Sequence, residues 1–184
     1  SGDWSSDVCS SDLALAAAIA SALALIVFGP VLKWVATGWA GGDMLSTYVN
    51  AEVWQGFKYR ITDQFGFPLG MNLNYFPGID ITENTFAHVV SLITGKPFLG
   101  INLLILMSFP VTAFLTYFLF RMTRLTGPLA IAGAVVFSLL PYHFGRALGH
   151  VYLSTLYSAV TGLALVLLIG SGRLEQLFTV IRKG

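Results

Sequence analysis

The chain carries little charge. Of its 184 residues only 10% are Asp, Glu, Lys or Arg, whereas 55% are hydrophobic and 14% are aromatic. In an ordinary soluble domain about a quarter of the residues are charged, and a disordered chain has few hydrophobic residues. The composition therefore excludes both a soluble domain and a disordered chain. The net charge of +1 provides no basic surface for nucleic acid. The sequence therefore predicts an integral membrane protein that lies in the lipid bilayer.

Cysteine is almost absent, because Cys9 is the only one in the chain. This sequence therefore contains no pair of thiols for an internal disulfide and no cysteine-based metal site. The three histidines, His88, His143 and His150, lack the spacing of a structural metal site. We expect no cofactor. A divalent metal ion is compatible with the chain, but no motif supports one.

The first twelve residues, SGDWSSDVCSSD, differ from everything that follows. They hold three of the nine acidic residues and none of the Lys or Arg residues that open a signal peptide. Residues 2–13 resemble the conceptual translation of a short-read sequencing adapter. We therefore expect residues 1–12 to be an assembly artefact, with a short polar cytoplasmic tail as the alternative.

Four apolar stretches follow, at about 13–29, 99–120, 126–144 and 151–170. A helix needs about 20 apolar residues to cross a bilayer. The pattern predicts an all-α, polytopic transmembrane helix bundle with about four spans. We expect residues 13–184 to form one membrane domain that is truncated at both ends, so the remainder of its own chain would be a partner.

A long loop, residues 40–98, separates the first two spans. Apolar residues recur at helical spacing over residues 44–58 and again over residues 83–94. Each pattern predicts an amphipathic helix, with an apolar and a polar face, that lies along the membrane surface. The sequence FGFPLGMNLNYFPG between them is typical of an ordered, turn-rich connector.

The Lys and Arg residues predict the orientation. Arg121 and Arg124 follow the second span closely, and Arg173, Arg182 and Lys183 follow the fourth. Basic residues gather on the cytoplasmic side. We therefore expect the long loop and the connection between the third and fourth spans to be extracytoplasmic.

The first candidate site residue is Asp43, which follows Gly41 and Gly42 at the end of the first span. Two glycines let a ligand approach a carboxylate closely. Asp43 also precedes a predicted helix, so it can equally serve as an N-cap. Tyr48 lies on that helix and belongs to the same candidate site.

A second candidate site lies between the last two spans, in the sequence YHFGRALGH. It brings His143, Arg146 and His150 together, and side chains of these types bind phosphate. Aromatic and basic residues also anchor helix ends at the membrane interface, so that interpretation stays open. A third candidate group is Asp80 and Glu83 with His88, although Thr82 and Glu83 also resemble a helix start.

The order of these features resembles the N-terminal part of the GT-C superfamily of polytopic glycosyltransferases. The resemblance rests on GGDMLSTYVN, FGFPLGMNLNYFPG, ITGKPFLGINLLILMSF and SLLPYHFGRALGHVYLS, in that order, within residues 13–170. It implies a bacterial plasma-membrane enzyme that moves a sugar from a polyprenyl-phosphate donor to an extracytoplasmic acceptor. It also implies that Asp43 is the catalytic carboxylate. No second acid forms a DxD pattern with Asp43.

The resemblance also implies roles for the other candidates. Arg146, with His150 or His143, would stabilise the departing phosphate. Tyr48 and Glu83 would line the substrate site. The alternative is a non-enzymatic membrane protein, either a transporter or an assembly subunit. A transporter is expected to place polar or broken helices at mid-membrane depth, whereas the ionisable residues here gather outside the spans.

Overall fold

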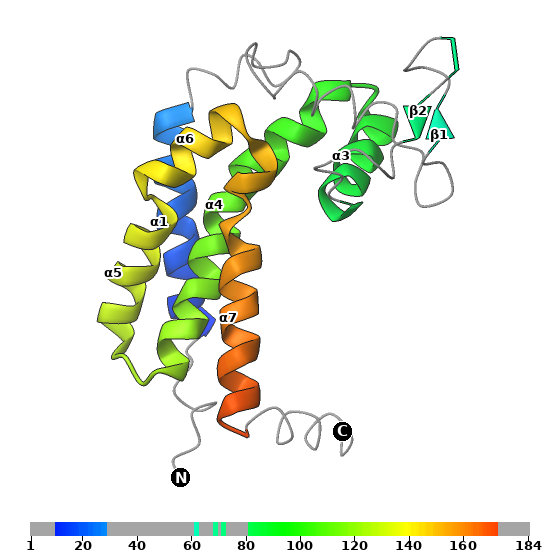
Figure 1. Ribbon diagram of the computed structural model, residues 1–184. Helices are drawn as coiled ribbons and strands as arrows, with labels where there is room; N and C mark the ends of the chain where they lie inside the picture. The colour runs from blue at the N-terminus through cyan, green and yellow to red at the C-terminus, as the bar shows by residue number, and fades with distance from the viewer. Residues whose placement is uncertain (1–9, 29–60, 63–67, 70, 73–80, 173–184) are drawn as a thin grey trace. The chain divides into compact units, whose positions relative to one another are not determined.

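The computed structural model describes residues 10–28, 61–62, 68–69, 71–72 and 81–172 (Figure 1). The elements in chain order are helix α1 (Ser10–Phe28), strands β1 (Ile61–Thr62) and β2 (Met71–Asn72), helices α3 (Ile81–Thr94), α4 (Pro97–Met122), α5 (Gly127–Ser138) and α6 (Pro141–Gly149), the 3₁₀ helix η4 (Val151–Ser154) and helix α7 (Leu156–Gly170). The two strands pair antiparallel, with Ile61 opposite Asn72. The described chain is otherwise built of helices and turns, which confirms the predicted all-α class. The predicted helix at 44–58 lies outside the described residues.

Three stretches are long and apolar enough to cross a membrane. They are Ser10–Phe28, Phe98–Met122 and Gly127–Ala147, and the shorter apolar helix Leu156–Gly170 follows them. The first two match the predicted spans at 13–29 and 99–120 within a few residues. The first begins inside the polar string of residues 1–12. The prediction was an all-α transmembrane bundle with about four spans, and the structure confirms it with three such helices and one shorter apolar helix.

The third predicted span, 126–144, is divided between α5 and α6. Pro141 has no N–H to donate, and its ring disfavours a helical conformation at the residue before it. Leu140 accordingly adopts an extended backbone, with φ −56° and ψ 141°. Pro141 then begins α6, because proline is well tolerated in the first turn of a helix. The polar cluster after the third span therefore lies on a separate short helix.

The fourth predicted span begins later than expected. Residues 151–154 form the 3₁₀ helix η4, and α7 covers only 15 residues. The Ser154 and Ser158 hydroxyls each donate a 2.6 Å hydrogen bond to the carbonyl three residues earlier. Such bonds compete with the regular helical pattern. A helix of this length spans about 22 Å, less than the roughly 30 Å of a hydrocarbon core.

Helix α3 confirms the helix predicted at 83–94. It ends at Thr94 because Gly95 adopts a left-handed backbone with φ +65°. The Gly95 N–H donates to the Ser91 carbonyl at 2.8 Å, which closes the last turn. Only Gly95 and Lys96 separate α3 from α4.

The turn between α4 and α5 is a Schellman motif. Arg124 has a left-handed backbone with φ 66°. The Leu125 N–H donates to the Phe120 carbonyl at 3.1 Å, and the Arg124 N–H donates to Arg121 at 3.0 Å. The Arg121 side chain also donates to the Leu125 carbonyl. These bonds reverse the chain within a few residues.

The described helices divide into two compact units. The first unit consists of α1 up to Ala20, α4 from Phe109 onward, α5 and α7. Its core cluster consists of Ala16, Tyr117, Ala130 and Ala134, all fully buried. Small residues let membrane helices approach closely. The buried Tyr117 hydroxyl donates to Asp12 Oδ2 at 3.0 Å, which ties α1 to α4.

The second unit takes the end of α1, the start of α4, and α3, α6 and η4. Its closest contact joins α3 and α4 at Gly100. A Cβ atom on Gly100 would lie 2.3 Å from the Ala87 carbonyl oxygen, so only glycine fits there. This unit also contains the polar residues that the sequence places between the third and fourth spans.

Candidate functional site

The candidate site is built on α6, whose two sides differ. Pro141 begins the helix, and the His150 N–H closes it by donating to the Arg146 carbonyl at 2.7 Å. His143 and Ala147 are fully buried, whereas Tyr142 is half exposed and Arg146 is half-buried. Helical spacing puts the two buried residues on one face and the Tyr142–Arg146 pair on the adjacent face, about 100° around the helix.

The packed side of α6 holds a buried polar contact. His143 Nε2 lies 2.8 Å from Ser108 Oγ of α4, and both side chains are buried. Ser108 Oγ also donates to the Ile105 carbonyl at 2.7 Å. Which of the two atoms donates in the Ser108–His143 contact depends on the tautomer of the His143 ring.

An aromatic contact also holds α6 against the protein. The ring of Phe144 stacks on the ring of Phe28 at the end of α1, with centroids 5.6 Å apart and an interplanar angle of 29°. Offset aromatic pairs of this kind contribute about 0.5–1.5 kcal/mol beyond their burial. Two consecutive residues, His143 and Phe144, therefore attach α6 to two different helices.

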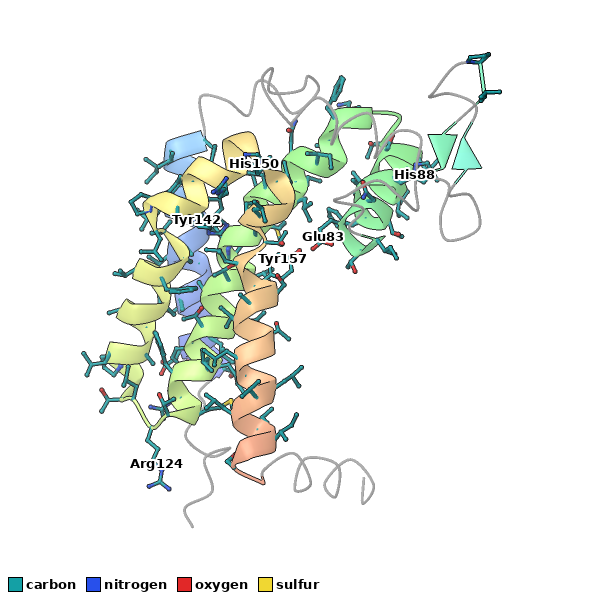
Figure 2. The ribbon with its side chains drawn as sticks, in the orientation of Figure 1. Glu83, His88, Arg124, Tyr142, His150 and Tyr157 are labelled. Atoms are coloured by element: carbon teal, nitrogen blue, oxygen red, sulfur yellow. The ribbon has the colours of Figure 1, made fainter. Side chains whose placement is uncertain are left out.

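The adjacent face of α6 carries the positively charged side chain of Arg146. Arg146 Cζ lies 5.2 Å from the centre of the Tyr142 ring. Such a contact orients the guanidinium and contributes about 0.5–1 kcal/mol at an exposed site. His150 is exposed at the end of the helix, and Figure 2 labels it together with Tyr142. Arg146 and His150 are therefore accessible, whereas the His143 ring is enclosed by protein.

The remaining predicted site residues lie elsewhere. Glu83 is buried on α3, and His88 is half-buried on the same helix. Asp43, Tyr48 and Asp80 lie outside the described residues. The described chain contains no group of three or more His, Cys, Asp or Glu side chains that could hold a metal ion.

Ser108 is the residue that sequence reasoning missed. It lies within an uncharged span, where a serine commonly bonds to its own helix. The only available signal was a small polar residue in an apolar run. Its partner is 35 positions away in the sequence, so the contact depends on how α6 docks.

The Ser108–His143 contact gives a stability prediction. Ser108→Ala removes the hydrogen-bond partner of a buried ring nitrogen, which costs about 1–3 kcal/mol. Ser158→Ala is the matched control, because Ser158 makes the same bond to the carbonyl three residues back but lies on the exposed side of α7. We expect Ser108→Ala to lower the thermal unfolding midpoint in nanodiscs and Ser158→Ala to leave it nearly unchanged. Equal effects would contradict the pairing.

Comparison with known proteins yields no match to any family model, curated protein or solved structure.

Proposed function

We propose that this chain is part of a GT-C-like glycosyltransferase in a bacterial plasma membrane. It would transfer a sugar from a polyprenyl-phosphate donor to an acceptor on the extracytoplasmic side. The observation that carries the proposal is the accessible cation on α6. Arg146 is held over Tyr142 and is only half-buried, whereas His143 of the same helix is fully buried. Guanidinium groups bind phosphate oxygens through paired hydrogen bonds.

The proposed reaction exchanges one bond to the anomeric carbon for another. Asp43 accepts the proton of the acceptor hydroxyl, and the oxygen attacks the anomeric carbon. The bond between that carbon and the phosphate oxygen breaks, and the polyprenyl phosphate leaves with the electron pair. Arg146 stabilises its negative charge, with His150 as a second donor. Tyr48 and Glu83 are proposed to contact the substrates.

The test of this proposal uses Arg146 variants and a panel of radiolabelled polyprenyl-phosphate sugars in nanodiscs. A hydrogen bond to a charged group contributes about 1.5–3 kcal/mol, so Arg146→Ala should weaken donor binding about 10- to 150-fold. Arg146→Lys keeps the charge but loses the paired geometry, so it should restore only part of the affinity. Unchanged binding of every donor by Arg146→Ala would contradict the role of Arg146.

One observation favours the alternative of a non-enzymatic transporter or assembly subunit. Helix α4 carries a row of buried hydroxyls at helical spacing, Ser108, Thr112 and Thr116. Hydroxyl side chains in spans frequently join membrane helices to one another. Transport of a solute, or assembly with another membrane protein, without binding or transfer of any donor sugar would identify this second function as the correct one.

A further inference from the structure

Helix α3 turns its apolar side outward. The exposed fractions are 41% for Phe86, 45% for Val89, 70% for Leu92 and 79% for Ile93. At 3.6 residues per turn, these four side chains fall within one arc about 120° wide. We call this set the apolar arc of α3. The arc contains no charged residue.

The opposite side of α3 is packed against protein and is polar. Glu83, Asn84 and Ala87 are buried there, and Ala87 lies against Gly100 of α4. Glu83 and His88 point to different sides of α3 (Figure 2). The sequence predicts these two faces, and the structure shows that the polar one packs against protein. In water, an exposed arc of large apolar side chains costs about 25 cal/mol per Å².

Chain connectivity brings the apolar arc to the membrane. Ile93 is followed after Thr94, Gly95 and Lys96 by α4, which contains the long apolar stretch Phe98–Met122. The end of α3 must therefore lie at the level where α4 enters the bilayer. Lys96 is exposed at this junction. A lysine there can extend its ammonium group to the lipid headgroups.

We propose that the apolar arc of α3 is a lipid-binding surface. α3 lies in the membrane interface with Phe86, Val89, Leu92 and Ile93 against the acyl chains, and its polar side against the protein. An interfacial helix of this kind buries its apolar face about 5–10 Å below the headgroup boundary. Glu83 and Asn84 are thereby held at the membrane surface on the protein side, away from bulk water.

Spin labels test the proposal on the full chain. Cys9→Ser removes the native thiol, and Val89→Cys and Ile93→Cys then each receive one nitroxide. Phosphatidylglycerol and phosphatidylcholine nanodiscs provide the bilayer. Collisions with oxygen, which concentrates among acyl chains, are compared with collisions with a water-soluble nickel chelate. Met107→Cys in the middle of α4 is the lipid control, because Met107 is 52% exposed. Arg124→Cys in the α4–α5 turn is the water control.

We expect the labels at positions 89 and 93 to collide with oxygen, as the label at position 107 does. We also expect them to be shielded from the nickel chelate. Both results correspond to a label depth of about 5–10 Å below the headgroup boundary. Nickel access equal to that at 124 would mean that water covers the arc and would overturn the proposal. Shielding from both reagents would mean that a protein surface, either a second copy or another partner, covers the arc and would also overturn it. Both labelled positions are exposed, so the labels should be tolerated, and circular dichroism checks the fold.

Discussion

Asp43→Asn is expected to lower glycosyl transfer about 10²- to 10⁴-fold, the range for removing a positioned general base. The amide keeps the size and polarity of the carboxylate but cannot accept the proton of the acceptor hydroxyl. Binding of the polyprenyl-phosphate donor should remain, because the proposed role of Asp43 is to act on the acceptor. Transfer measured with a labelled donor, beside donor binding, separates the two effects.

The control for Asp43 is Asp80, another acid of residues 40–98. Asp80→Asn should retain most of the transfer activity, because Asp80 is proposed neither to act as the base nor to contact the substrates. Full activity in Asp43→Asn would mean that Asp43 is only a helix cap. The catalytic carboxylate would then have to be Asp80 or Glu83.

Gly100→Ala is expected to destabilise the second unit strongly. The new Cβ would lie 2.3 Å from the Ala87 carbonyl oxygen and 2.5 Å from its Cα, and backbone atoms cannot rotate away. Overpacking of this kind costs about 1–3 kcal/mol, and α3 and α4 have to separate to relieve it. Thermal unfolding in nanodiscs measures the loss.

Gly162→Ala is the matched control for Gly100→Ala. A Cβ atom there meets nothing within 4 Å, and the residue lies inside α7. Replacing a helical glycine by alanine stabilises a helix by about 0.5–1 kcal/mol. The two substitutions should therefore shift the unfolding midpoint in opposite directions. A loss of stability in Gly162→Ala as large as in Gly100→Ala would show that the contact with Ala87 is not the cause.

The helices that the sequence predicts best are those with uninterrupted apolar runs and clear end signals. The bounds of α1 and α4 follow from composition, and the end of α3 follows from Gly95. The division of the third span at Leu140 is also a local effect, since Pro141 is visible in the sequence. The predicted span nevertheless continues to residue 144, because a helix needs about 20 residues to cross a bilayer.

The contacts around α6 could not be predicted, because they depend on tertiary packing. The pattern YHFGRALGH groups His143 with Arg146, but in the helix His143 contacts Ser108 and Arg146 contacts Tyr142. Ser108 becomes visible only when α6 packs on α4. Likewise, helical periodicity identifies the two faces of α3, but it does not reveal that the protein covers the polar face and leaves the apolar one exposed.

The central claim is that Asp43 and Arg146 work on the same, extracytoplasmic face of a multi-spanning protein. Cysteine labelling in a Cys9→Ser background tests it most directly, with single cysteines at Asp63, Gly78, Gly145 and Arg124. Gly145 accepts a side chain, because a Cβ atom there meets nothing within 4 Å. A membrane-impermeant maleimide should label positions 63, 78 and 145 in intact cells, and position 124 only after permeabilisation. Labelling of 124 in intact cells, with 63, 78 and 145 protected, would contradict the orientation and the proposed reaction together.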